Sequence, residues 1–218
     1  MPEPDFSESL RALGIIPVVT LDNADGALAL ADAFFAGGLP ILEVTFRTNA
    51  AAAAIQILTR ERPALLVGAG TVLTRENLQA AKAAGAQFAL APGLNSEIVK
   101  EARDLDLPFI PGVATPTEIE RALALGCRTL KLFPAGPLGG VEMVVALSAP
   151  YGHTGVSFVP TGGINLSSLE AYLRCKSVAA VGGTWLAKRD DLASGNWTGI
   201  CERCRSAVET VRAVRQSI

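Results

Sequence analysis

The sequence predicts an α/β protein folded as a closed (β/α)₈ barrel, and three observations lead to this prediction. Short apolar runs bounded by glycine or proline recur along the 218 residues, and eight of them are long enough to form a strand. Alanine- and leucine-rich segments with helical spacing separate these runs, and several begin at Asp, Asn, Ser or Thr and end at Gly. Near-continuous apolar strands alternating with helices indicate a covered parallel sheet, and eight such units in about 200 residues fit a barrel.

The expected elements alternate as strand and helix, after a short leading helix over residues 5–12. We expect one domain over residues 1–218 with the TIM-barrel architecture, because no linker or charge block interrupts the alternation. An open doubly wound sheet is the alternative, but its glycine fingerprint follows the first strand, whereas the glycine-rich turns here follow the last strands. The expected strands are residues 14–21, 40–46, 65–72, 87–93, 108–115, 129–135, 156–163 and 177–185.

Composition and charge exclude several classes of partner. The 19 basic and 21 acidic residues give a net charge of -2 with no basic run, which argues against nucleic-acid binding. The mean hydropathy is +0.35, yet no window holds the 18 or more consecutive apolar residues of a membrane span. The start MPEPDFSESLRALG lacks the basic and apolar regions of a signal peptide. We therefore expect a cytoplasmic protein that acts on a small molecule.

A lysine lies at the centre of one apolar strand, RTLKLFPAG at residues 128–136. Lys131 stands between Leu130 and Leu132, and lysine is rarely buried without a partner. A lysine amine in an apolar setting loses its proton more readily and becomes a nucleophile suited to Schiff-base formation. The alternative is that the side chain extends out of the strand end and only pairs with a carboxylate.

Polar side chains alternate along the second expected strand, LEVTFRT. Glu43, Thr45 and Arg47 share one face of this strand, which we expect to point into the barrel. A carboxylate near Lys131 would supply the base that imine formation and carbon-bound proton transfer need, and a guanidinium suits a substrate carboxylate. Thr71, in the GAGT segment, could add a hydroxyl to that carboxylate. The alternative is an internal Glu43–Arg47 ion pair that only stabilises the strand.

Two glycine pairs close the last two expected strands, PTGGIN at 160–165 and VGGTW at 181–185. Glycines let backbone amides approach an anion, and the loops after strands seven and eight are the recurrent phosphate site of this barrel class. Gly162, Gly163, Gly183 and Thr184 are therefore candidate phosphate-binding residues. The alternative is that the glycines only form tight turns.

Neither a metal site nor a cofactor is expected. The chain has one histidine, His153, in an expected surface loop, and a catalytic metal site normally draws on several imidazoles. Cys201 and Cys204 form a CxxC pair, but a structural zinc site needs a second ligand pair. We interpret them as thiols of a terminal helix without a functional role.

A series of motifs carries a resemblance to a known family. EVTFRT, GAGTVL, APGL, IPGVATPTE, LKLFPA, PTGGIN and GGTW occur in this order between about residues 10 and 195. They closely resemble the 2-keto-3-deoxy-6-phosphogluconate (KDPG) aldolases of the Entner–Doudoroff pathway, many of which also cleave 4-hydroxy-2-oxoglutarate (KHG). The resemblance implies a class I aldolase that splits a phosphorylated keto acid without a cofactor, typically as a homotrimer.

The resemblance also implies roles for individual side chains. The family often has an acidic residue after FPA, where this chain has Gly136. The implied roles are Schiff-base formation for Lys131, acid–base work through water for Glu43, carboxylate binding for Arg47 and Thr71, contact with the substrate hydroxyls for Thr161, the pyruvate wall for Pro92 and Phe133, and phosphate binding for the two glycine turns.

Three alternatives to this function remain. A phosphosugar isomerase or epimerase would share the glycine turns but would need no lysine in an apolar strand. A sensor barrel would bind phosphosugars without consuming them. The related 6-phosphogalactonate aldolase typically has a non-arginine sequence after its strand-two glutamate, so the FRT that follows Glu43, Val44 and Thr45 favours the gluconate substrate.

Overall fold

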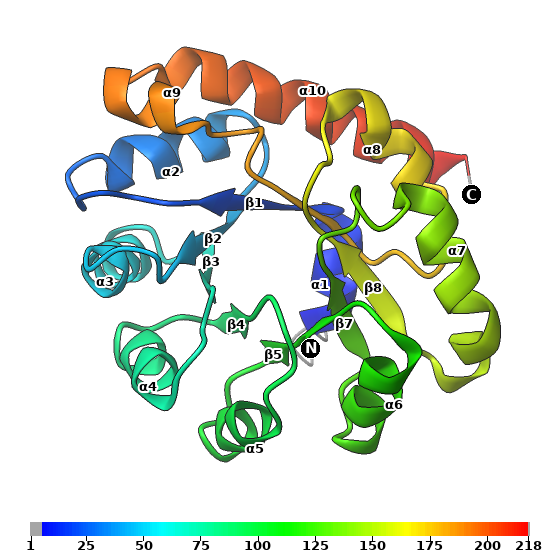
Figure 1. Cartoon of the computed structure of the whole chain (residues 1–218). Helices are drawn as coiled ribbons and strands as arrows, with labels where there is room; N and C mark the ends of the chain where they lie inside the picture. Colours follow the sequence, from blue (N-terminus) through cyan, green and yellow to red (C-terminus); the bar gives the residue numbers. More distant parts are fainter. Residues whose placement is uncertain (1–5, 218) are drawn as a thin grey trace, which may run out of the picture.

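The computed structural model describes residues 6–217, in which a ring of helices surrounds parallel strands (Figure 1). Each expected strand is present, and the leading helix is α1, while residue 5 lies outside the described residues. The elements are α1 Phe6–Leu13, β1 Ile15–Val19, α2 Ala27–Ala36, β2 Ile41–Thr45, α3 Ala51–Glu61, β3 Leu66–Gly70, α4 Arg75–Ala83, β4 Phe88–Leu90, α5 Ser96–Asp104, β5 Phe109–Ile110, β6 Gly112–Val113, α6 Pro116–Ala124, β7 Thr129–Leu132, α7 Gly140–Tyr151, η1 Gly152–Thr154, β8 Ser157–Pro160, α8 Leu166–Leu173, β9 Val181–Gly183, α9 Arg189–Ser194 and α10 Trp197–Gln216.

The strands close into a barrel at two junctions. Six pair in the order β5-β4-β3-β2-β1-β9 and three in the order β6-β7-β8, all parallel. β5 and β6 are the two parts of the expected strand 108–115, divided at Pro111, which has no N–H to donate. Bridges Phe158↔Val178 and Thr161↔Gly182 join β8 to the β9 segment. The predicted (β/α)₈ barrel is therefore confirmed, and the doubly wound alternative is wrong.

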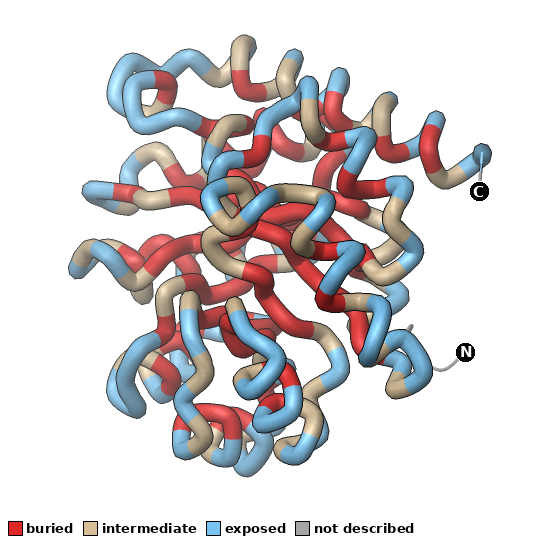
Figure 2. The backbone as a smooth tube through the Cα atoms, turned by 45° about the vertical axis from the view of Figure 1, so that its right-hand side comes forward, coloured by how far each residue is buried: buried red, intermediate tan, exposed pale blue. Residues whose placement is uncertain are grey.

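The strands are buried on both faces, as the apolar runs predicted. Every residue of β1 and β2 is buried, and Figure 2 shows the buried chain at the centre with exposed segments in the surrounding helices. α1 lies near the amino-terminal ends of the strands, where Phe6 packs on Phe88 with ring centroids 5.1 Å apart. The opposite, carboxyl-terminal end is left open for a site.

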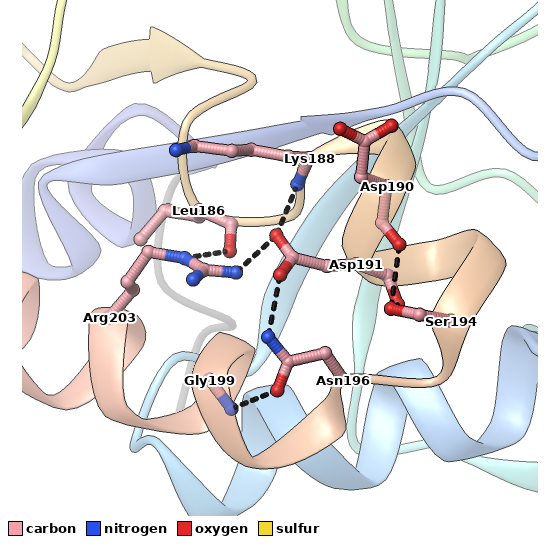
Figure 3. A network of polar contacts seen from close by, with 8 residues as sticks. All are labelled: Leu186, Lys188, Asp190, Asp191, Ser194, Asn196, Gly199 and Arg203. Atoms are coloured by element: carbon pink, nitrogen blue, oxygen red, sulfur yellow. Dashed lines mark hydrogen bonds and ion pairs between the residues drawn. The ribbon is translucent and has the colours of Figure 1, made fainter.

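A buried carboxylate fixes the segment that follows β9 (Figure 3). Asp191 of α9 accepts hydrogen bonds from the Lys188 backbone amide at 3.2 Å, from Asn196 Nδ2 at 2.8 Å and from Arg203 Nη2 at 2.5 Å. Arg203 of α10 also donates from Nε to the Leu186 carbonyl at 3.0 Å. These contacts attach the segment directly after the VGGTW turn to α10.

The carboxyl-terminal helix α10 packs closely on α2. Cys204 is fully buried in this contact, and Gly37, directly after α2, faces it. The CxxC pair therefore lies in a terminal helix, as predicted, and both thiols are free. Among residues 6–217, no helix is both long and apolar enough to cross a membrane.

Replacing Gly37 by alanine should destabilise the fold. The new β carbon would lie 2.4 Å from the Cys204 β carbon and 2.9 Å from the Cys201 carbonyl oxygen, so α2 and α10 would have to move apart. Such overpacking costs about 1–3 kcal/mol of unfolding free energy. Urea unfolding should show a lower midpoint with an unchanged slope.

Gly152 provides the matched control. Its φ of -54° is helical, and a β carbon there would meet nothing within 4 Å. Gly152→Ala should therefore be neutral or stabilise by about 0.4–1 kcal/mol, through reduced freedom of the unfolded chain. Equal midpoints for the two variants would contradict the tight α2–α10 contact.

Candidate active site

Lys131 points into the barrel from β7. Its neighbours Leu130 and Leu132 are fully buried on the outer face, while the Lys131 side chain is 6% exposed on the inner face. The backbone fixes this position, because the Lys131 amide donates to the Pro111 carbonyl at 2.9 Å. The alternative that Lys131 extends out of the strand end is therefore wrong.

Glu43 meets Lys131 inside the barrel. Counting β5 and β6 as one strand, β2 and β7 are the second and sixth of eight, so the two side chains approach from opposite walls. Lys131 Nζ lies 3.3 Å from Glu43 Oε1, and the Glu43 side chain is 1% exposed. Glu43 Oε2 is buried and has no hydrogen-bond partner among the described residues. One carboxylate oxygen therefore contacts the amine while the other remains available to water or substrate.

Arg47 does not lie on the strand where the alternation placed it. β2 ends at Thr45, and Arg47 lies in the following turn, where its side chain is exposed. The Phe46 amide still donates to the Gly70 carbonyl at 2.8 Å, but the Thr48 hydroxyl then turns the chain by donating to the Leu21 carbonyl at 2.6 Å. The Glu43–Arg47 ion pair is also wrong, because Glu43 pairs with Lys131.

A pocket of about 90 Å³ joins these groups at the carboxyl-terminal end of the barrel. Except for Glu43, which contacts the lining residue Lys131, every residue that the sequence marked as a site candidate lines the pocket. The sequence missed Val18 and Ile164, two apolar residues whose positions in VVT and GGIN carry no chemical signal. The lining residues are Val18, Arg47, Thr71, Pro92, Lys131, Phe133, Thr161, Gly162, Gly163, Ile164, Gly183 and Thr184.

The glycine turns leave backbone donors at this pocket. Gly162 and Gly163 have φ of 96° and 76°, a left-handed conformation that other residues rarely adopt. Among the hydrogen bonds of residues 6–217, none is donated by the backbone amides of Gly162, Gly163 or Thr184. Gly136 fits beside them, since its amide donates to the Gly162 carbonyl at 2.8 Å and a β carbon would lie 3.1 Å from that oxygen. Unpaired amides of this kind can bind an anion.

Thr71 stands in a strained conformation at the same pocket. Its φ is 56°, which is unusual for a β-branched residue. Both flanks are anchored, because the Gly70 carbonyl accepts from the Phe46 amide and the Val72 amide donates to the Leu90 carbonyl at 3.0 Å. Strain of this kind persists where surrounding structure enforces it, often at functional sites.

The other chemical candidates lie away from the pocket. His153 is exposed in η1, as predicted for a surface residue. Cys201 and Cys204 lie on α10, and burial raises the pKa of the Cys204 thiol to about 12, which keeps it protonated and unreactive at neutral pH. Neither CxxC thiol contributes to the pocket lining.

A barrel that brings a buried lysine against a carboxylate, below unpaired backbone amides, is the arrangement of a metal-independent class I aldolase. The chain belongs to the KDPG and KHG aldolase family, whose model matches residues 6–203.

Similar proteins cover nearly the whole chain. The 2-dehydro-3-deoxy-phosphogluconate aldolase of Haemophilus influenzae is 44% identical over 94% of this chain and 96% of its own length. The KHG/KDPG aldolase of Escherichia coli is 40% identical over 93% and 95%. The KDPG aldolase of Legionella pneumophila, solved with pyruvate captured at low pH as a covalent carbinolamine intermediate, superposes with a TM-score of 0.88 at 39% identity, over 93% of this chain and 98% of that chain.

Removing one partner of the buried pair should destabilise the protein more than removing both. Lys131→Met leaves the Glu43 carboxylate buried without a cation, which should cost about 3–5 kcal/mol of unfolding free energy. Adding Glu43→Gln removes the remaining charge and should recover most of that loss. Urea unfolding of the two single variants, the double variant and the parent protein measures the coupling. If the losses of unfolding free energy in the two single variants add up to the loss in the double variant, the two side chains do not form the ion pair.

Proposed function

We propose that the protein is a class I aldolase that cleaves KDPG into pyruvate and glyceraldehyde 3-phosphate, and also cleaves KHG into pyruvate and glyoxylate. The observation that carries the proposal is the Lys131 amine 3.3 Å from the Glu43 carboxylate at the inner end of the pocket. The names of the Haemophilus and Escherichia relatives support the two substrates. The captured carbinolamine of the Legionella structure supports the covalent route.

Lys131 and Glu43 perform the covalent steps together. Glu43 accepts the proton of the amine, which attacks the substrate ketone, and then returns a proton as water leaves to give the imine. Glu43 then takes the proton of the carbon 4 hydroxyl through a water molecule, the bond between carbons 3 and 4 breaks, and its electron pair moves into the imine to give an enamine. The aldehyde departs, Glu43 returns the proton to carbon 3 of the enamine, and water releases pyruvate and the free amine.

The remaining pocket residues hold the two ends of the substrate. Arg47 and Thr71 bind the carboxylate of the pyruvyl half, where a guanidinium makes two parallel hydrogen bonds. Gly162, Gly163 and the Gly183–Thr184 turn bind the phosphate through backbone amides. Pro92 and Phe133 form the wall around the pyruvyl carbons, and Thr161 contacts the substrate hydroxyls. These assignments rest on the shared pocket and on the family resemblance.

The assembly and location are also part of the proposal. We propose one catalytic domain over residues 1–218, acting as a homotrimer in the cytoplasm, where phosphorylated keto acids are retained by their charge. The resemblance of the sequence motifs to the family, whose members are typically homotrimers, supports the trimer.

Pyruvate and sodium borohydride should attach one reduced pyruvyl group to Lys131. The reducing agent converts the imine into a stable secondary amine, which trypsin does not cleave. Digestion should therefore yield an adduct-bearing peptide over residues 129–174 in place of separate peptides ending at Lys131 and Arg174. Intact mass and peptide mapping measure this.

Lys131→Ala should show no adduct and no cleavage of KDPG. Lys82→Ala, on the outer helix α4, is the matched control and should keep both. Absence of an adduct in the parent protein would refute the covalent mechanism and favour an isomerase. Binding of KDPG without turnover or adduct would favour a sensor.

Arg47→Ala should weaken pyruvate binding far more than phosphate binding. Hydrogen bonds to charged groups contribute about 1.5–3 kcal/mol, so the dissociation constant for pyruvate should rise roughly ten- to hundredfold. Calorimetric titration with pyruvate and with inorganic phosphate measures both effects. Arg189→Ala is the control, because Arg189 is exposed and pairs with Asp22 in a neighbouring cleft. An equal loss for both ligands would remove Arg47 from the carboxylate site.

A further inference from the structure

Three inward-facing glycines make room for residues of the pocket. A β carbon on Gly70 would lie 1.9 Å from Glu43 Oε1, one on Gly112 would lie 2.1 Å from the Pro92 carbonyl oxygen, and one on Gly182 would lie 2.2 Å from Thr161 Oγ1. None of the three glycines has a positive φ. Glycine is therefore required at these positions for space and not for backbone conformation.

Gly70 has the closest of these contacts, and it involves the proposed base. Glu43 on β2 extends along the inner face of β3, whose Gly70 pairs with Thr45. A β carbon on Gly70 would also lie 2.5 Å from both Cγ and Cδ of Glu43. The collision therefore involves most of the side chain, including the oxygen that lies 3.3 Å from Lys131 Nζ.

The backbone of Gly70 cannot retreat to relieve such a collision. Its carbonyl accepts from the Phe46 amide at 2.8 Å, and the next strand holds Val72 through the Leu90 carbonyl. Thr71 between them already has a strained φ of 56°. Because the surroundings are fixed, the Glu43 side chain would have to move.

We propose that Gly70 is a positioning residue whose missing side chain sets the Glu43 carboxylate against Lys131. The inference rests on the proposed function, since it concerns the proton transfers assigned to Glu43. Arg47 and the phosphate-binding turns lie elsewhere in the pocket, while Thr71, which follows Gly70, is held in place through the Val72 amide. Displacing the carboxylate therefore slows proton transfer and leaves substrate binding largely intact.

Gly70→Ala should lower kcat for KDPG about 10²-fold or more, the scale of general acid–base catalysis, and change KM by less than about threefold. Exchange of the pyruvate methyl protons with deuterium oxide, followed by NMR, should slow in parallel because it requires the same base. Glu43→Gln should slow exchange in the parent protein but add little in the Gly70→Ala background. If the fold-losses in exchange rate of Glu43→Gln and Gly70→Ala multiply in the double variant, the two residues act independently and the inference is wrong.

Gly68→Ala is the matched control. Gly68 lies on the same strand and face and pairs with Glu43 across the sheet, but the three atoms nearest to its β carbon all belong to the Phe88 ring, the first at 2.2 Å. This variant should lose stability while keeping the exchange rate per folded molecule. An equal loss of exchange in Gly68→Ala would mean that any distortion of β3 is sufficient, and would overturn the specific role of Gly70.

A second measurement applies if Gly70→Ala does not fold. Glu43→Ala removes the colliding side chain, so the Glu43→Ala/Gly70→Ala protein should fold with the melting temperature of Glu43→Ala alone. A double variant that still fails to fold would refute the Gly70–Glu43 contact. If Glu43→Gln has no effect on exchange, the proposed function fails; if Glu43→Gln slows exchange but Gly70→Ala does not, only this inference fails.

Discussion

The ion pair between Lys131 and Glu43 is the interaction on which the rest of the site depends. Two charges that are almost fully buried each cost several kcal/mol in lost hydration, and their attraction offsets this only with good geometry and further hydrogen bonds. Here the contact is a single one at 3.3 Å, and Glu43 Oε2 has no partner among the described residues. The pair is therefore incompletely compensated, which fits groups retained for chemistry more than for stability.

The barrel allows this pair because it brings residues from opposite walls to its centre. Side chains of β2 and β7 can touch only if the strands between them leave the middle of the barrel unfilled. Gly70 on β3 leaves room for the Glu43 side chain, and Gly112 on β6 leaves room for the Pro92 carbonyl. The break at Pro111 connects the two sheets of the barrel. Ile110 before it pairs with β4, and the Pro111 carbonyl accepts a hydrogen bond from the Lys131 amide of β7.

The sequence predicted the strands and the central chemistry because both leave local signals. Apolar runs mark the strands, and a lysine inside such a run marks Lys131. Other features depend on neighbours that a single chain does not reveal. Arg47 continued the alternation of β2, but that strand ends at Thr45, and the Thr48 hydroxyl turns the chain toward the Leu21 carbonyl. Pro111 carried a local signal for the break between β5 and β6, because proline has no N–H to donate to a neighbouring strand. The need for glycine at position 70 has no such local signal, since it follows from the register between β2 and β3.

Three departures from local rules meet in this one region: a charge within an apolar strand, a β-branched residue with positive φ at Thr71, and an unpaired oxygen of Glu43. The surrounding helices largely obey those rules, with side-chain caps at Thr74, Asn95 and Thr115. Each departure costs stability that the large apolar core can offset. Single departures also occur elsewhere among the described residues, such as the φ of 50° at Asp106 and the buried Arg215 Nε without a partner, whereas these three coincide around one pair of side chains and so argue for one cause. The proton transfer proposed at Lys131 accounts for the charge and the free oxygen together, while the strain at Thr71 persists because the residues on both sides of it are anchored.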